Sequence, residues 1–301
     1  MKEMIKSFRQ LYGQEMPKLS GKEIMNCIID VGGGNRDVMA AGVFDRLMDD
    51  HIAIDCCIGV SAGAANCCSY AAGQRGRNLK FYTGYNFSPR AIGLLAWLKT
   101  GGSMVDMDYI YQELSGSKGR CPLDYEAYAA SDIDVKYVAT DALTGRPVYF
   151  GKNEITKDNY GVLSASSAHP LYCKPYDYKG RTYFDGFLSD PIPVKKAVED
   201  GFDKIILILL LPKDHFKGGS KDKDIASRIK NYPKVAELMA GYSKLYNDEL
   251  KLALELEAQG RCLILAPDSF IEISAVSKNK KEILKIYNDG YKKAEAVRGF
   301  L

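Results

Sequence analysis

The sequence predicts an α/β protein built on a mainly parallel central sheet, with a helical C-terminal portion. Short apolar runs alternate with helical segments in the order strand, glycine loop, helix, strand, helix. The most apolar run, IILILLL at 205–211, has the composition of a strand that is buried on both faces. It is far shorter than the roughly 20 residues that a membrane-spanning helix needs.

The order of elements supports this fold class. The first elements are expected at 24–31 (strand), 32–35 (loop), 36–51 (helix), 53–59 (strand) and 61–73 (helix). Further strands are expected at 134–142, 147–151, 181–186, 204–211 and 261–267. A long helix is expected from Lys234 to Ala258, because apolar residues recur there with the spacing of one helix face.

The domain organisation follows from the absence of any long linker or internal repeat. Residues 1–23 form a polar extension, and residues 24–301 form a single domain. Within this domain the motifs lie in 24–212, and 213–301 is the helical C-terminal portion. The N-terminus is charged and lacks the apolar region of a secretory signal, which predicts a cytoplasmic protein.

Composition narrows the function classes. The net charge is +3, and lysine and arginine are spread along the chain, which argues against a nucleic-acid partner. The eight cysteines form no Cys-x-x-Cys pair, so we expect free thiols and no metal site.

The first motif is Gly59-Val60-Ser61-Ala62-Gly63, between an apolar strand and an alanine-rich helix. Gly-x-Ser-x-Gly at such a turn is typical of a nucleophilic serine, because glycines on either side relieve crowding in a sharp bend. The alternative is an ordinary strand-to-helix turn with a capping serine.

The second motif is the loop from Gly32 through Gly33 and Gly34 to Arg36, which precedes the first helix. Its backbone N–H groups can approach an anion at the positive end of the helix dipole. A dinucleotide loop is disfavoured because the next strand does not end in an acidic residue, and the P-loop sequence is absent. An oxyanion hole fits better. Arg36 is expected to orient the loop, to meet a substrate phosphate or simply to be solvated.

The third motif is Asp185-Gly186, where a short aromatic strand ends. A carboxylate there lies where an α/β fold places catalytic groups, and the glycine keeps the approach open. With these three motifs in this order, the chain resembles the bacterial type of patatin-like phospholipases over about 24–212. The segment 164–170 is similar to the small-residue stretch that precedes the Asp-Gly strand in that family.

The resemblance implies a three-layer α/β/α fold and a serine hydrolase acting on lipid acyl esters, of the phospholipase A or lysophospholipase kind. Ser61 would be the nucleophile and Asp185 its proton acceptor, with Gly32, Gly33 and Gly34 as the oxyanion hole. Arg36, Gly59, Gly63 and Gly186 would support these motifs. No histidine base, metal or cofactor is implied.

Two residues depart from the family pattern. Asp37 stands where the family usually has glycine, and Phe187 stands where it has glycine or alanine. Asp37 adds a negative charge near the expected anion site, or serves as a favourable charge at a helix N-terminus.

The three histidines do not supply an obvious triad. His51 is expected at the surface, and His169 is expected to be a partly buried polar residue beside the site. His215 is the best alternative base. An α/β-hydrolase using it would need more strands ahead of the serine than 60 residues allow.

The expected partner is a lipid or acyl-ester substrate, met in solution or at a membrane surface. The segment 91–98, which holds the only tryptophan, is expected to be a buried core helix, with a lid or an interfacial contact as the alternative. The lysine-rich loop 213–234 is expected to be solvated. Rival functions are a non-catalytic lipid-binding scaffold and a nucleotide-binding oxidoreductase.

Overall fold

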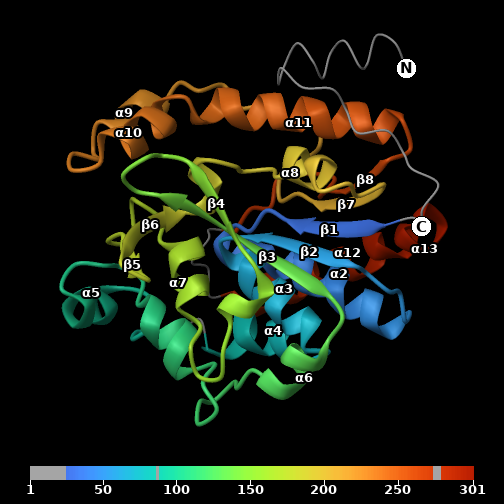
Figure 1. Ribbon diagram of the computed structural model, residues 1–301, viewed down its shortest axis with the longest axis horizontal. Coiled ribbons are helices and arrows are strands. Elements are labelled where there is room, and N and C mark those ends of the chain that lie inside the picture. Colours follow the sequence, from blue (N-terminus) through green and yellow to red (C-terminus); the bar gives the residue numbers. More distant parts are fainter. Residues whose placement is uncertain (1–24, 86–87, 274–278) are drawn as a thin grey trace.

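A single mixed sheet lies at the centre of the protein (Figure 1). The computed structural model describes residues 25–85, 88–273 and 279–301, so the extension expected at 1–23 lies outside the described residues. The strand order is β5-β6-β3-β2-β1-β7-β8, with β4 also paired to β3. The strands are β1 (Asn26–Asp30), β2 (Cys56–Val60), β3 (Asp134–Asp141), β4 (Pro147–Phe150), β5 (Tyr176–Tyr178), β6 (Arg181–Asp185), β7 (Lys204–Ile208) and β8 (Cys262–Leu265).

The predicted mainly parallel sheet is confirmed. Strands β3, β2, β1, β7 and β8 run parallel to their neighbours, whereas β4 and β6 pair with β3 in the antiparallel sense. The short strand β5, which the sequence analysis missed, forms an antiparallel hairpin with β6. The glycine loop and Ser61 follow β1 and β2, and these strands are direct neighbours.

Helices cover both faces of the sheet, which confirms the three-layer architecture. Helices α8 and α11 lie on one face, and α2, α3 and α7 lie on the other (Figure 1). The helices are α2 (Val38–Asp49), α3 (Ala62–Ala71), α4 (Arg77–Lys80), α5 (Leu94–Thr100), α6 (Tyr125–Ala130), α7 (Gly161–Ser167), α8 (Val194–Glu199), α9 (Asp222–Ala226), α10 (Pro233–Ala240), α11 (Tyr242–Ala258), α12 (Lys280–Lys293) and α13 (Val297–Phe300). Short helical turns are η1 (Gly34–Asp37), η2 (Phe81–Tyr85), η3 (Tyr109–Glu113), η4 (Lys152–Glu154), η5 (Gly186–Leu188) and η6 (Ala294–Ala296).

The apolar runs of the central strands follow from this burial on two sides. In β1, Cys27 and Ile29 face the core under α8 and α11, and Ile28 faces the core under α2 and α3. Strand β7 repeats the pattern with Ile205 and Leu207 against Ile206. Successive side chains point to opposite faces, so a strand covered on both faces needs apolar residues at every position.

The helix expected from Lys234 to Ala258 is in fact two helices. The chain breaks at Gly241, which caps both α10 and α11. Val235 and Met239 of α10 belong to a small core with Phe184 and Leu188, whereas α11 packs on the sheet. The apolar stripe is continuous in sequence, but its two halves cover different parts of the protein.

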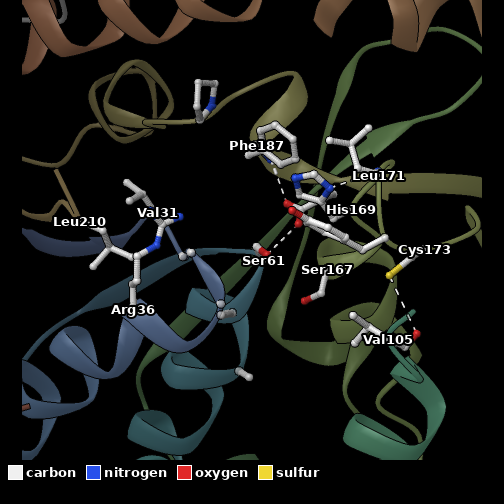
Figure 2. Close-up of a pocket in the computed structure, with 18 of the residues that line it drawn as sticks. Val31, Arg36, Ser61, Val105, Ser167, His169, Leu171, Cys173, Phe187 and Leu210 are labelled. Carbon is white, nitrogen blue, oxygen red and sulfur yellow. Dashed lines mark hydrogen bonds between the residues drawn. The ribbon is translucent and has the colours of Figure 1, made fainter. Parts of the chain in front are cut away.

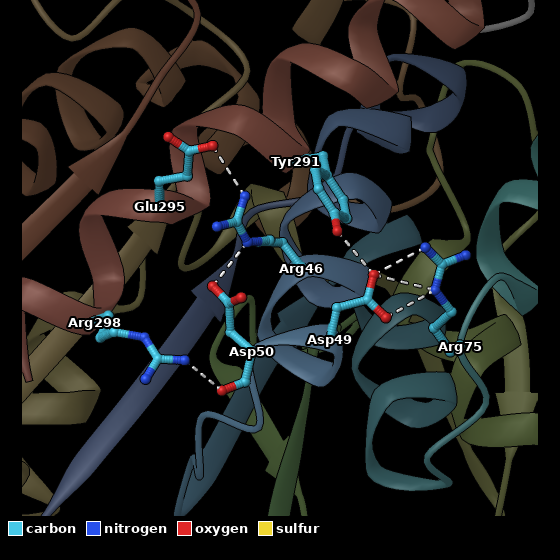
Figure 3. A network of polar contacts seen from close by, with 7 residues as sticks. All are labelled: Arg46, Asp49, Asp50, Arg75, Tyr291, Glu295 and Arg298. Carbon is cyan, nitrogen blue, oxygen red and sulfur yellow. Dashed lines mark hydrogen bonds and ion pairs between the residues drawn. The ribbon is translucent and has the colours of Figure 1, made fainter.

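The C-terminal residues are not purely helical. Strand β8 extends the sheet, and α12 packs against α2 so closely that a Cβ on Gly290 would lie 2.0 Å from the carbonyl oxygen of Met39. Polar contacts on the surface accompany this packing (Figure 3). Arg46 of α2 pairs with Glu295 at 3.0 Å, and Tyr291 donates to Asp49 at 2.9 Å.

Candidate active site

Ser61 lies in the sharp turn between β2 and α3. Its φ of 57° and ψ of −125° are strained for a residue with a side chain, and such strain is typical of functional sites. The flanking glycines allow the close packing of the turn: a Cβ on Gly59 would lie 2.5 Å from the Cα of Ala64, and a Cβ on Gly63 would lie 2.4 Å from the Asp30 carbonyl oxygen. The turn therefore projects the Ser61 hydroxyl beyond the carboxyl end of the sheet.

Asp185 stands at the end of β6 and meets Ser61 directly (Figure 2). The Ser61 hydroxyl donates to Asp185 Oδ2 at 2.7 Å. The other carboxylate oxygen accepts from the backbone N–H of Phe187 at 3.2 Å, which orients the carboxyl group. Gly186 is required by close approach, since a Cβ there would lie 2.4 Å from the Val138 carbonyl oxygen. The structure thus brings a serine hydroxyl and a carboxylate into hydrogen-bond contact without a histidine between them.

Burial changes the acid–base behaviour of Asp185. Its side chain is 1% exposed, and this burial raises the pKa of Asp185 from its usual range to about 7. The hydrogen bonds from Ser61 and Phe187 act in the opposite direction and lower the pKa. A carboxylate that titrates near neutral pH is a far better proton acceptor than an ordinary aspartate.

The glycine loop leaves β1 beside this pair. Gly32, Gly33 and Gly34 all have positive φ values, a backbone conformation that only glycine adopts without strain. The Gly32 N–H donates to the side chain of Asp30 at 3.1 Å, so it serves to hold the loop rather than to bind an anion. The assignment of the loop glycines as oxyanion donors stays a prediction.

Ser166, in the small-residue segment, is a supporting residue to which the sequence analysis gave no role. Its hydroxyl accepts the backbone N–H of Ser61 at 3.0 Å and donates to the Val138 carbonyl oxygen at 2.7 Å. It thereby ties the strained turn to α7 and β3. The signal was visible in the run of small residues at 164–168, but the partner could be found only in the folded protein.

The three histidines do not occupy the position of a base for Ser61, whose hydroxyl donates to Asp185 instead. His169 lines the cavity and stacks on Phe187 with ring centroids 4.8 Å apart, and burial lowers its pKa to about 4, which keeps it neutral. His215 also lines the cavity and packs edge-on against Phe270. His51 is exposed, as expected.

A cavity of about 630 Å³ opens around Ser61. On one side its lining is mainly apolar and comes from α3, η2, η3 and the segments near Val105 and Cys173 (Figure 2). On the other side Arg36 and Leu210 line it, together with Lys217 (Figure 2 labels the first two). The expectation of a fully solvated lysine-rich loop is wrong at Lys217, which is largely buried.

The apolar helix α5 is exposed, so the expectation of a core helix is wrong. Only Ala96 of α5 is buried, whereas Leu94 is 70% exposed and Leu98 is 62% exposed. Neighbouring Ile92 and Val105 line the cavity. The helix is apolar because it offers a surface next to the cavity, not because it fills the interior.

The structure also bears on the cysteines, on a metal site and on a membrane-spanning helix. All eight cysteines are buried and free. Residues 25–85, 88–273 and 279–301 contain no group of three or more histidine, cysteine, aspartate or glutamate side chains suited to hold a metal ion. Within the same ranges no helix is long and apolar enough to cross a membrane.

Parts of the chain are similar to known protein families and proteins. A family model described as patatin-like phospholipase matches residues 31–198, which is more than half of the chain, and a domain of unknown function, DUF6363, matches residues 232–297. An uncharacterised protein of Escherichia coli K12, YjjU, is 30% identical over 191 residues; the match covers 62% of this chain and 52% of that protein. The solved structure of VipD from Legionella pneumophila has a TM-score of 0.47 and 11% identity, covering 92% of this chain and 67% of that one.

The raised pKa of Asp185 predicts the pH dependence of Ser61 reactivity. Only the ionised carboxylate can accept the serine proton, so the rate of labelling by a fluorophosphonate should rise as the pH passes through about 7. The measurement is the second-order labelling rate between pH 5 and 8, followed by intact mass. A rate that is already at its maximum at pH 5 and stays constant to pH 8, as expected if Asp185 titrated near pH 4 like an unperturbed aspartate, would contradict the role of burial.

Proposed function

The chain belongs to the patatin-like phospholipase family, and on this premise we propose that it is a serine hydrolase that cleaves lipid acyl esters through a Ser61–Asp185 dyad. The observation that carries the proposal is the 2.7 Å hydrogen bond from the Ser61 hydroxyl to a buried carboxylate. The glycine loop and the cavity around the serine support it.

The proposed reaction has two halves. Ser61 Oγ attacks the ester carbonyl carbon while its proton passes to Asp185, and the N–H groups of Gly33 and Gly34 stabilise the oxyanion, each donor by about 3–4 kcal/mol. Asp185 then protonates the leaving alcohol as the carbon–oxygen bond breaks, which leaves an acyl-serine. In the second half Asp185 takes a proton from water, the hydroxide attacks the acyl group, and the proton returns to Ser61.

The two sides of the cavity suggest where the parts of an ester would lie. The mainly apolar side suits an acyl chain. On the other side Arg36 and Lys217 both line the cavity. Burial and then the charge of Arg36 lower the pKa of Lys217, and the carboxylate of Asp222 acts in the opposite direction. Arg36 Nε is buried without a hydrogen-bond partner. We propose that an anionic group on the leaving alcohol, such as a phosphate, binds between them.

The exposed face of α5 suggests how the site meets its substrate. From residue 91 to 105 the chain has one lysine and no carboxylate, and Ile92 and Val105, near its two ends, line the cavity. Met104 donates its N–H to the carbonyl of Tyr172, another exposed residue that lines the cavity. We propose that this surface rests on a membrane, with Trp97 at the boundary with water. Buried cysteines without disulfides are typical of proteins in a reducing compartment, which favours a cytoplasmic location.

The dyad predicts that both Ser61→Ala and Asp185→Asn lose ester hydrolysis, by about a thousandfold or more. The measurement combines turnover of a short-chain ester with intact mass after fluorophosphonate treatment. Wild type should gain one adduct, and the two variants should gain none under the same conditions. Full activity in Asp185→Asn would exclude the dyad, and an inert wild-type protein would favour the non-catalytic scaffold.

The proposed anion subsite predicts that Lys217→Gln discriminates between substrates. KM for a lysophospholipid should rise about tenfold because one charged contact is lost, whereas KM for a neutral monoacylglycerol should stay unchanged. Lys223→Gln is the matched control, since Lys223 is exposed on α9 and does not line the cavity. Equal losses on both substrates would assign Lys217 to structure instead.

The membrane contact can be followed through Trp97, because it is the only tryptophan. With Ser61→Ala protein and vesicles of non-hydrolysable diether phospholipid, its emission should shift to the blue. Replacing Leu94 and Leu98 by Gln should abolish the shift and vesicle cosedimentation. Leu143→Gln is the control, since Leu143 is 82% exposed but belongs to the turn between β3 and β4. A blue shift that depends on protein concentration without vesicles would indicate self-association.

A further inference from the structure

Two carboxyl groups are buried together behind the glycine loop, and the proposed reaction uses neither. Asp30 ends β1 and Asp37 ends η1, and both are fully buried at 0% exposure. Asp37 precedes α2 but its side chain makes no capping hydrogen bond, so it is not the helix-capping charge that the sequence allowed. It turns instead into the interior.

A single amide joins the two carboxyl groups. The side-chain nitrogen of Asn66, on α3, donates to Asp30 Oδ2 at 3.0 Å and to Asp37 Oδ2 at 2.9 Å. The oxygen of the same amide accepts from the Tyr82 hydroxyl at 3.3 Å. The Gly32 N–H donates to Asp30 Oδ1. Together these contacts connect the glycine loop to α3, the helix that follows Ser61.

The charges do not balance if both carboxyl groups are ionised. The titratable groups that act on Asp37 are Asp30, Cys67 of α3 and Tyr82 of η2, and none of them is a cation. From the C-terminal part of the chain, Ile283 of α12 packs in one apolar cluster with Val38 and Tyr82. Two buried negative charges with no cation among their contacts would carry a desolvation penalty of several kcal/mol per ion.

The hydrogen bonds indicate which of the two carboxyl groups carries a proton. Asp37 Oδ1 is a buried oxygen with no donor, whereas both oxygens of Asp30 already accept hydrogen bonds. An oxygen without a donor is satisfied if it carries a proton and donates it. Burial and the neighbouring carboxylate both raise the pKa of Asp37 well above its usual range, in agreement with this arrangement.

We propose that Asp37 is a positioning residue that stays protonated at neutral pH and donates its carboxyl proton to Asp30. The shared proton keeps the glycine loop fixed to the start of α3, so that the oxyanion donors and Ser61 stay in register. When Asp37 ionises, the second negative charge strains this junction and opposes the oxyanion that forms beside the loop. The part of the proposal that concerns activity rests on the proposed function, and the part that concerns stability does not.

The sign of the pH effect on stability is fixed by the direction of the shift. Unfolded Asp37 loses its proton near pH 4, whereas folded Asp37 keeps it to a higher pH. The stabilising contribution is therefore complete below about pH 4 and is lost as the pH rises towards the folded pKa. An asparagine at this position is a neutral mimic of the protonated acid and does not suffer that loss.

The test is the melting temperature and the rate of ester hydrolysis between pH 5 and 9, for wild type, Asp37→Asn and Asp30→Asn. Asp37→Asn should melt higher than wild type, by about 2 °C or more at pH 8, with a margin that widens as the pH rises. Its activity should persist to more alkaline pH than that of wild type. Asp30→Asn should melt lower, because in either orientation its NH2 group would face a donor, the Asn66 amide or the Gly32 N–H.

Asp45→Asn is the matched control, since Asp45 is a buried aspartate of α2 that pairs with Tyr287 away from the cavity. Its alkaline activity profile should equal that of wild type. The proposal is overturned if Asp37→Asn melts lower than wild type at every pH, or if the two isosteric variants are equally destabilised. It is equally overturned if the alkaline limb of Asp37→Asn matches wild type while Ser61 is active. A wild-type protein without esterase activity would refute the proposed function alone, because the melting curves still test the shared proton.

Discussion

The hydrogen bond between Ser61 and Asp185 is the interaction on which the rest of the site depends. It exists because β2 and β6 both border β3, so that their C-terminal ends lie on either side of the same part of β3. The two strands run in opposite directions, yet β6 meets β3 near the end where β2 stops, since Ala139 pairs with Asp185 and Val138 pairs with Val60. The register of β3 therefore sets the distance between the Ser61 hydroxyl and the Asp185 carboxylate.

Burial raises the pKa values of several carboxyl groups around the site. Burial raises the pKa of Asp185 to about 7, and it raises the pKa of Asp37 well above its usual range. A second pair of buried acids, Asp190 and Glu249, lies close together, and the backbone N–H of Ile192 donates to Glu249 at 2.7 Å. Burial raises the pKa of Asp190 to about 6. The ionisation of these acids, which lie in or beside the loops that carry the motifs, therefore depends on their burial.

The sequence predicted what is encoded locally. The three motifs, the strand that precedes each one and the neighbourhood of β1 and β2 were all readable, because turns and buried strands impose their residues directly. Exposure of α5 was not readable, since an apolar helix in the core and one at a surface have the same composition. Nor was the side chain of Asp37 readable, because its partner Asn66 is 29 residues away in the chain.

The placement of Lys217 shows why the motifs alone would not fix the choice of ester. Lys217 lies outside the matched residues 31–198, in a loop that the sequence offered only as a charged run. Its ammonium group lies over the ring of Tyr246, 4.5 Å from the centroid, and its backbone N–H donates to Asn247 at 2.8 Å. Both partners belong to α11, which packs on the sheet. Helix α11 thereby holds a cation at the cavity, which Tyr242 and Tyr246 of the same helix also line. If the proposed subsite is correct, the family motifs supply the bond-breaking groups, and this C-terminal helix selects the alcohol that leaves.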